Sequence, residues 1–269
     1  LHDNPVPEYV TAVNSGIYEA CRANGYFLLP EPVDRNAPDF IDRLQSFLMT
    51  SRADGVVLTP PLCDDPDILA LLKDNGTAYA SLSPARQPEN TPVMRLDDRL
   101  AAMEMTRHLV ERGHTRIAFI AGPVGHNAST GRHEGFLDAM HEAGLKVSPD
   151  LIAEGDYSLR SGLEAANKLI GSNPKPTAIF AANDDMAVGA MTAVMAAGFK
   201  VPGEISIAGY DDTRLASAVW PPLTTIRQPV AEMGRRAAER LMNTDDEAGV
   251  EEVFDFELIV RQSTGNIPT

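Results

Sequence analysis

Two pairs of adjacent carboxylates are the residues of this sequence best suited to chemistry. Asp184 and Asp185 follow one short apolar segment, and Asp211 and Asp212 follow another. Paired acids can act as a general acid and base when a nucleophile or metal accompanies them. No nucleophile motif stands near either pair, and the dipole of a following helix accounts for Asp184 and Asp185. The sequence therefore predicts no catalytic residues and no enzymatic activity.

Histidine and cysteine are the next candidates for chemistry, as ligands of a metal ion. Five of the six histidines lie close together in the sequence: His108, His114, His126, His133 and His141. They lack the H-E-x-x-H spacing of a zinc site, so we expect surface or capping roles. Cys21 and Cys63 are too few for a disulfide framework, which predicts buried free thiols and a cytoplasmic protein. We expect neither a metal nor a cofactor.

The composition limits the possible partners. The 269 residues suffice for one large or two medium domains, and 43% of them are hydrophobic. A net charge of −15 argues against a broad nucleic-acid surface, which needs clustered Lys and Arg. No run approaches the roughly 20 apolar residues of a membrane helix. We therefore expect that this segment neither associates with a membrane nor binds DNA directly.

Helical and strand patterns alternate along the chain. Helices are expected at residues 9–24, 38–49, 67–74, 99–112, 131–143, 161–170, 186–199 and 230–242. Strands are expected at residues 26–29, 54–59, 78–82, 93–96, 116–121, 151–154, 177–181, 205–208, 223–226 and 253–260. This alternation predicts an α/β protein with parallel sheets flanked by helices. The abrupt polar opening after Leu1 suggests a further strand upstream.

A hydroxylated ligand would use the polar residues near the predicted strand ends. Such a ligand needs planar bidentate partners and an apolar ring face. The candidates are Arg132, Asn183, Asp211 and Gln228, with Tyr157 or Tyr9 as the ring. Each has an alternative structural role, for example Asn183 as a helix N-cap. Their shared position at strand ends favours a binding cleft.

Two further features have roles that the residue types leave open. Trp220 stands beside Pro221, and we expect it to pack under a bend rather than to reach a ligand. The helix at 186–199 carries Met186, Met191 and Met195, which suit either a core stripe or a subunit interface.

Several ordered motifs resemble the effector-binding region of lactose and galactose repressor-type (LacI/GalR-type) transcription regulators. They are L-V-E-R-G-H at 109–114, G-R-H-E-G-F at 131–136, A-N-D at 182–184, and G-Y-D-D at 209–212 with P-L-T-T-I at 222–226. The resemblance covers nearly the whole chain. It implies a periplasmic-binding-protein-like fold of two Rossmann-like subdomains joined by three crossovers. The subdomains would be residues 1–97 with 227–250, and residues 98–226 with 251–269.

The resemblance also implies roles for particular residues. Arg132 matches the arginine of the R-x-x-G-F motif, Asn183 the asparagine of A-N-D, and Asp211 the first aspartate after G-Y, all of which bind effector in the family. The aromatic positions match Tyr157 and Tyr9. Gln228 matches a crossover position that can touch sugar, and Ser83 is a further candidate.

The expected role is therefore an effector-binding and dimerisation domain of a DNA-binding regulator, most simply a repressor. Effector binding would shift a homodimer between DNA-competent and DNA-incompetent states. The first helix and the helix at 186–199 are the expected dimer faces, and operator DNA would be held by a domain upstream of Leu1. A sugar is the favoured effector, although relatives bind purines with comparable positions. The alternative is a solute-binding protein of a sugar uptake system.

Overall fold

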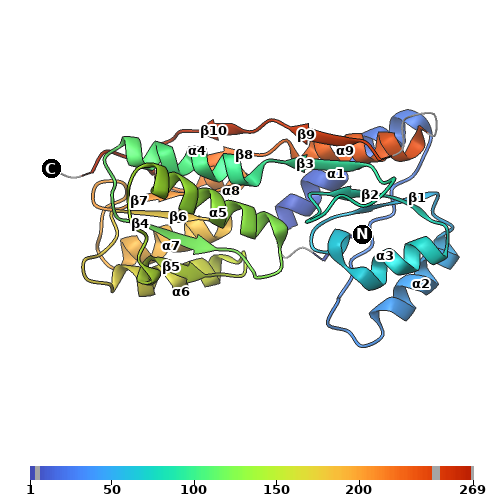
Figure 1. Ribbon diagram of the computed structural model, residues 1–269, viewed down its shortest axis with the longest axis horizontal. Helices are drawn as coiled ribbons and strands as arrows, with labels where there is room; N and C mark the ends of the chain where they lie inside the picture. Colours follow the sequence, from blue (N-terminus) through green and yellow to red (C-terminus); the bar gives the residue numbers. More distant parts are fainter. Residues whose placement is uncertain (4–6, 244–248, 268–269) are drawn as a thin grey trace. The chain divides into compact units, whose positions relative to one another are not determined.

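The computed structural model describes residues 1–3, 7–243 and 249–267 (Figure 1). The chain forms two compact units, and it passes between them three times. The first unit is Leu1–Leu96 with Pro229–Phe254, and the second is Asp97–Gln228 with Asp255–Thr269. The third passage lies four residues beyond the expected position, because residues 251–254 form a strand that pairs within the first unit. The expected strand at 253–260 is consequently two separate strands.

The first unit has a four-stranded parallel sheet of order β1-β2-β3-β9. Its strands are β1 (Gly55–Leu58), β2 (Ala78–Leu82), β3 (Val93–Leu96) and β9 (Glu251–Phe254). Its helices are α1 (Pro7–Asn24), α2 (Phe40–Ser51), α3 (Pro66–Asp74) and α9 (Val230–Met242). Two apolar clusters hold it together. One joins α1 and α9 to Ala80, Leu82 and Met94, and the other joins α2 and α3 to Val56 and Leu58. Helices thus bury both faces of the sheet.

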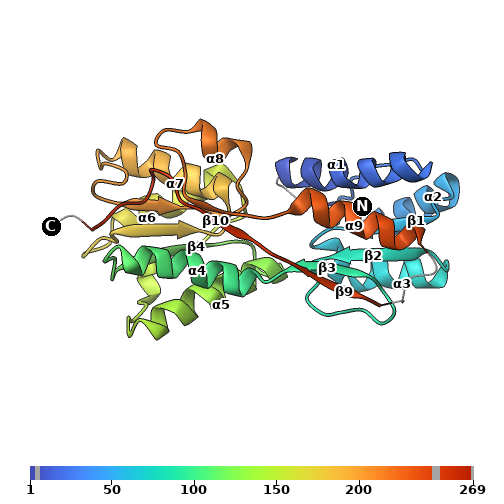
Figure 2. The same cartoon turned by 90° about the horizontal axis from the view of Figure 1, so that it is seen from above.

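The second unit repeats this plan with a parallel sheet of order β5-β4-β6-β7. Its strands are β4 (Ile117–Ala121), β5 (Ile152–Glu154), β6 (Ala178–Ala181) and β7 (Ser206–Ala208). Helices α4 (Asp98–Glu111) and α5 (Asn127–Glu142) lie on one side of the sheet, and α6 (Leu159–Ile170) and α7 (Asp184–Ala196) on the other (Figure 2). A short helix α8 (Arg214–Ala218) precedes β8 (Thr225–Arg227), which pairs antiparallel with β10 (Glu257–Ile259). The predicted α/β fold is confirmed.

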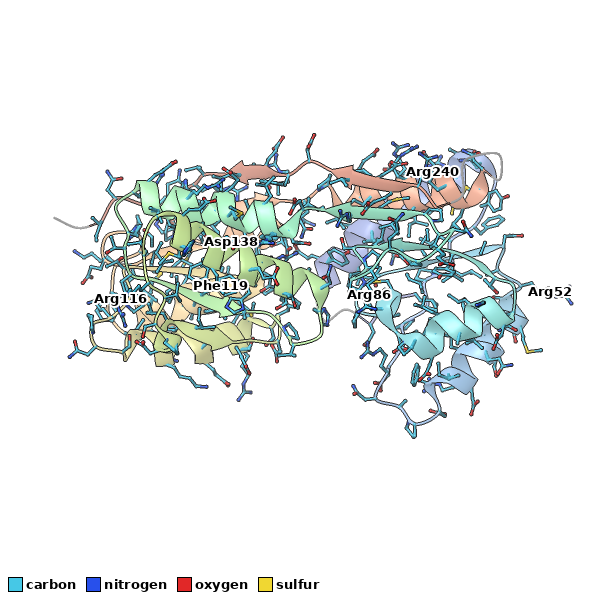
Figure 3. The ribbon with its side chains drawn as sticks, viewed as in Figure 1. Arg52, Arg86, Arg116, Phe119, Asp138 and Arg240 are labelled. Carbon is cyan, nitrogen blue, oxygen red and sulfur yellow. The ribbon has the colours of Figure 1, made fainter. Side chains whose placement is uncertain are left out.

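Aromatic packing marks the core of the second unit. Phe119 on β4, labelled in Figure 3, is fully buried and stacks on Phe136 with ring centroids 5.0 Å apart. The ring of Phe180 on β6 packs edge-on against the Phe119 ring, with centroids 5.3 Å apart. Strands β4 and β6 and helix α5 therefore share one packed aromatic core.

Two histidines belong to this interior and not to the surface as expected. His108 bonds to Thr264 at 3.0 Å, and His114 bonds to Thr177 and to the Gly265 carbonyl, each at 3.0 Å. Burial lowers the pKa of His108 to about 4, so its ring is neutral at pH 7. These rings fasten the C-terminal segment to the second unit.

Two further expectations are wrong. Residues 26–29 form no strand, and Phe27 is 92% exposed. Trp220 is 81% exposed, so it does not pack under a bend. Residue types alone could not reveal either outcome, because both depend on which other parts of the fold lie beside residues 26–29 and beside Trp220.

The paired helices of both units meet through glycine. A Cβ at Gly189 of α7 would lie 2.0 Å from the Leu159 carbonyl oxygen of α6, and one at Gly162 would lie 2.2 Å from that of Met186. The α4–α5 and α1–α9 pairs have the same feature at Gly135 and Gly16. No real Cβ tolerates such distances, so these glycines set the spacing of each helix pair.

We expect Gly189→Ala to lower the free energy of unfolding by about 1 to 3 kcal/mol, because the added methyl forces α6 and α7 apart. Chemical denaturation monitored by circular dichroism measures the change. Gly171→Ala is the matched control, since its Cβ would meet nothing closer than 3.4 Å. Equal stability of both variants would show that the helices can separate without cost.

Candidate functional site

Arg132 is the centre of a buried polar group in the second unit. It extends from α5, and only 6% of it is exposed. Its Nε donates to Oδ1 of Asp98 at 2.8 Å, and its Nη1 donates to the Ala182 carbonyl at 2.7 Å. The guanidinium carbon lies 3.7 Å from the centre of the Tyr210 ring. The start of α4 and the ends of β6 and β7 thus fix this side chain from three directions.

Asp98 and Tyr210 were not among the predicted site residues. Asp97 caps α4 by accepting from the Leu100 amide at 2.9 Å, which leaves the neighbouring Asp98 free to turn inward. The Tyr210 hydroxyl donates to Oδ1 of Asp98 at 3.0 Å. One carboxylate oxygen therefore anchors both a cation and a phenol. One signal in the sequence could have revealed Asp98. Two acids stand at the start of this helix, and only one is needed for capping, so the second is available for another role.

Asp211 lies next to this group, at the end of β7. Its Oδ1 is 3.8 Å from Nη1 of Arg132 and accepts from Nε2 of Gln228 at 2.6 Å. Burial raises the pKa of Asp211 to about 7, and the charge of Arg132 and the Gln228 bond offset only part of this effect. Its φ of 123° is unusual for a residue with a side chain. Such strain persists where the surroundings impose it, often at binding sites.

Asn183 and Tyr157 form the remaining side of the group. Oδ1 of Asn183 caps α7 by accepting from the Met186 amide, and its Nδ2 donates to the Tyr157 carbonyl, both at 3.0 Å. Tyr157 also has a positive φ, of 70°. Its ring lies so close to Gly122 that a Cβ there would be 2.4 Å from it, and it meets the His126 ring edge-on at 5.6 Å.

The structure brings five of the seven predicted residues together: Arg132, Asn183, Asp211, Tyr157 and Gln228. Tyr9 and Ser83 belong to the first unit. Tyr9 packs on the cluster of α1 and α9, and Ser83 follows β2 with a φ of 45°. Their roles remain predictions.

Two atoms of the group retain unused hydrogen-bonding capacity. Within the described residues, Nη2 of Arg132 and Oδ2 of Asp211 make no hydrogen bond. The fully buried side-chain atoms without partners in that part of the chain are Oγ of Ser81 and Nε2 of His133. The Arg132 and Asp211 side chains are 7% and 11% exposed, which leaves Nη2 as a donor and Oδ2 as an acceptor for a ligand.

Asp184 has a structural role beside this group. Its carboxyl group is fully buried and accepts from Oγ1 of Thr225 at 2.6 Å and from the Thr213 amide at 2.7 Å. Burial, together with the charge of Asp211, raises its pKa well above the usual range. It therefore fixes the loops after β7 and before β8 to the start of α7. The described residues hold no cluster of three or more potential metal ligands.

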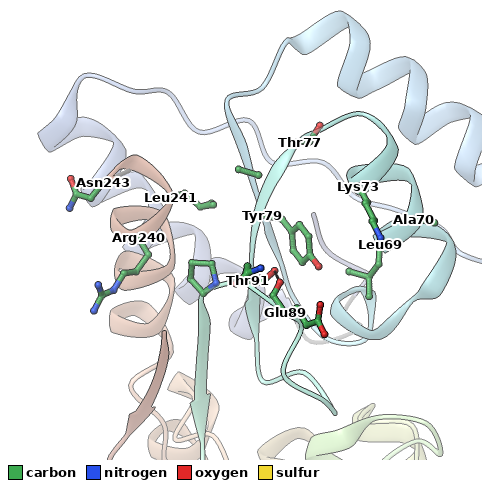
Figure 4. A pocket seen from close by; sticks show the side chains of 13 residues that line it. Leu69, Ala70, Lys73, Thr77, Tyr79, Glu89, Thr91, Arg240, Leu241 and Asn243 are labelled. Carbon is green, nitrogen blue, oxygen red and sulfur yellow. Dashed lines mark hydrogen bonds between the residues drawn. The ribbon is translucent and has the colours of Figure 1, made fainter. Parts of the chain in front are cut away.

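A separate cavity of about 760 Å³ lies in the first unit (Figure 4). Tyr79, Lys73, Glu89 and Thr91 line it, and Arg240, at its edge on α9, binds Glu252. None of the predicted site residues contributes to this cavity. None of the described helices is long and apolar enough to cross a membrane.

Comparison with known proteins explains the motifs that meet at Arg132. Residues 106–264 match the model of a periplasmic binding protein-like domain. The chain is 33% identical over 266 residues to the HTH-type transcriptional repressor PurR of Pasteurella multocida, with 95% of this chain and 77% of that protein covered. It is 30% identical to a LacI family transcriptional regulator from Mycobacterium smegmatis, with a TM-score of 0.86 over 97% of this chain and 96% of the other. The chain belongs to the LacI family of transcription regulators.

Other LacI-family relatives agree. The HTH-type transcriptional regulator DegA of Bacillus subtilis is 36% identical over 230 residues, with 83% of this chain and 68% of that protein covered. The structure of the transcriptional regulator CelR–cellobiose complex is 29% identical, with a TM-score of 0.85 over 95% of this chain and 79% of the other. The predicted resemblance is confirmed, and the alternative of an uptake protein is not favoured by these relatives.

We expect Asp98→Asn to lower the free energy of unfolding by about 3 kcal/mol, because it leaves the buried Arg132 charge with one carboxylate fewer. Denaturant unfolding measures the loss. Asp138→Asn is the matched control. Asp138 on α5 (Figure 3) forms a solvent-exposed ion pair with Arg99 on α4, so its removal should change the stability little. Equal losses would contradict a special role for Asp98.

Asp211→Asn should remove a pH-dependent loss of stability. A carboxyl group whose pKa is about 7 when folded and near 4 when unfolded binds more protons in the folded chain. Its neutral form therefore favours folding below pH 4, and this contribution is lost as the pH rises to about 7. We expect the variant to exceed the parent in stability by about 2 to 4 kcal/mol at pH 8, and by far less at pH 5. Parallel stability curves would contradict the raised pKa.

Proposed function

We propose that the group around Arg132 binds the effector of this LacI-family regulator, and that the effector is a neutral, polyhydroxylated molecule such as a sugar. The observation that carries this proposal is the pair of unused atoms, Nη2 of Arg132 and Oδ2 of Asp211. A guanidinium donor beside a carboxylate acceptor matches vicinal hydroxyl groups, which both donate and accept.

The charges of the group favour a neutral ligand over an anionic one. One cation, Arg132, faces two carboxyl groups, Asp98 and Asp211, and a third carboxyl group, Asp184, is buried nearby. A phosphate or carboxylate ligand would add negative charge to a site where Arg132 is already neutralised. Sugar phosphates and acids should therefore bind more weakly than neutral sugars. The structure of the CelR–cellobiose complex, a relative with a bound sugar, supports the same ligand class.

The remaining roles follow from the family. We infer a cytoplasmic homodimer whose operator-binding domain would precede Leu1, since its relatives are HTH-type regulators. Binding would shift the population between two DNA-binding states through contacts that differ between them. No catalytic step is proposed.

Calorimetric titration with neutral sugars, sugar phosphates and purines tests the ligand class. We expect the tightest ligand to be a neutral sugar, and Asp211→Asn to weaken it at least tenfold, about 1.4 kcal/mol. The variant should be the more stable protein at pH 8, so weaker binding could not be ascribed to unfolding. Asp138→Asn is the control and should bind as the parent does. A purine or a phosphate as the tightest ligand would contradict the proposal.

A further inference from the structure

Asp212 follows Asp211 directly, and its carboxyl group turns to a different set of partners. Its side chain is only 8% exposed. Oδ2 accepts from Nε of Arg227 at 2.7 Å, and Oδ1 accepts from Nη2 of Arg261 at 2.6 Å. One buried carboxylate thus binds two arginines, and none of these three residues was assigned to the effector site.

Both arginines are held on the antiparallel ribbon of β8 and β10. Arg227 lies opposite Glu257 in that ribbon, and its Nη1 donates to Oε2 of Glu257 at 2.9 Å. Arg261 follows β10, and its Nη1 donates to the Leu223 carbonyl at 2.8 Å. The Asp212 carboxylate is therefore tied to β8 through Arg227 and to the end of β10 through Arg261.

The backbone of Asp211 and Asp212 has an unfavourable conformation. Their φ angles are 123° and 54°, and within the described ranges they are the only adjacent non-glycine residues with positive φ. Such strain persists only where the surroundings impose it. The Asp211 amide donates to the Ile226 carbonyl at 2.8 Å, and the Asp212 amide donates to Oγ1 of Thr225 at 3.3 Å, which is long. The charge-assisted bonds of the Asp212 side chain are therefore the strongest contacts that hold this turn.

The two carboxylates bind two consecutive residues of the chain. Asp211 accepts from Nε2 of Gln228 at 2.6 Å, and Asp212 accepts from the neighbouring Arg227. A shift of Asp212 along β8 would carry Asp211 with it, because a peptide bond joins them. Asp211 has little room for such a shift, since its Oδ1 must stay within reach of both Gln228 and Nη1 of Arg132.

A role in stability alone explains these ion pairs less well. Arg227 is half exposed, and ion pairs of exposed side chains contribute little to stability. Glu257 already gives Arg227 a carboxylate partner. What Asp212 adds is a charged link between the ribbon and the turn that carries Asp211.

We propose that Asp212 is a positioning residue of the effector site, because its ion pairs with both arginines fix the turn that holds Asp211 beside Arg132. This inference rests on the proposed function, in which Asp211 binds a hydroxyl group of the effector. Asp212 acts through Asp211 and does not touch the effector itself. Loss of its ion pairs would free the turn, let the Asp211 carboxyl group move toward water, and thereby weaken effector binding.

Two variants that each remove one charge, Asp212→Asn and Arg227→Gln, test the positioning. NMR titration of the isotope-labelled Asp211 carboxyl carbon, without ligand, measures its pKa in the folded protein. If the turn loosens, the carboxyl group gains water, and its pKa should fall from about 7 to about 6 or lower in both variants. Arg227 is half exposed, so Arg227→Gln should fold even if Asp212→Asn does not. The charges that act on Asp211 in the parent are kept in both variants: Arg132, Asp98 and Asp185.

The pair of variants separates movement from a direct effect of charge. Loss of the Asp212 carboxylate would by itself lower the pKa of Asp211, whereas loss of the Arg227 cation would by itself raise it. A fall in both variants therefore reports movement of the carboxyl group. An unchanged Asp211 pKa, or a rise in Arg227→Gln, would overturn the proposal.

Calorimetric titration with neutral mono- and disaccharides, cellobiose among them, tests the consequence for the effector. Both variants should bind the tightest of these sugars at least tenfold more weakly than the parent, about 1.4 kcal/mol. Glu257→Gln is the matched control and should equal the parent in affinity and in Asp211 pKa, because it removes the other carboxylate on Arg227 and leaves both bonds of Asp212 in place.

The two measurements fail in different ways. A lowered Asp211 pKa with unchanged sugar affinity would overturn the link between Asp212 and the effector. If no neutral sugar binds the parent, the proposed function is wrong, and the Asp211 pKa alone then decides whether Asp212 positions that carboxyl group.

Discussion

The second unit depends on the buried bond between Arg132 and Asp98. A charged residue that is only 6% exposed costs much to desolvate, and Arg132 is tolerated because Asp98, the Ala182 carbonyl and the Tyr210 ring surround its guanidinium group. These partners come from the ends of different elements of one sheet and its helices. The bond therefore does more than neutralise a charge, since it fixes the spacing of the loops that carry Asn183 and Asp211.

The arrangement leaves the Asp211 carboxyl group in an unfavourable environment for its charged form. Asp211 is held near Arg132 but shares that cation with Asp98, so burial dominates and raises the Asp211 pKa to about 7. Positive φ values at Asp211 and Tyr157 add backbone strain at the same place. A residue kept strained and partly protonated lowers stability, which proteins tolerate where binding needs it. A ligand hydroxyl on Oδ2 would supply the hydrogen bond that Asp211 lacks.

Much of this could be predicted from the sequence. Alternating helix and strand patterns predicted the α/β class, and the motifs named Arg132, Asn183 and Asp211, which the structure brings together in one buried polar group. Asp98 was overlooked because a carboxylate at a helix start has a sufficient local explanation, and only the fold reveals that Asp97 already provides the cap. The strand at 26–29 was expected from residue type alone, whereas strand formation also requires a paired neighbour. Buried His108 and exposed Trp220 likewise depend on tertiary neighbours.

The most direct measurement of the central claim is a crystal structure of the protein with its tightest neutral sugar. The account predicts sugar oxygens within about 3.2 Å of both Nη2 of Arg132 and Oδ2 of Asp211, with the bond between Arg132 and Asp98 intact. A sugar bound without touching either atom, or one that displaces Asp98 from Arg132, would contradict it.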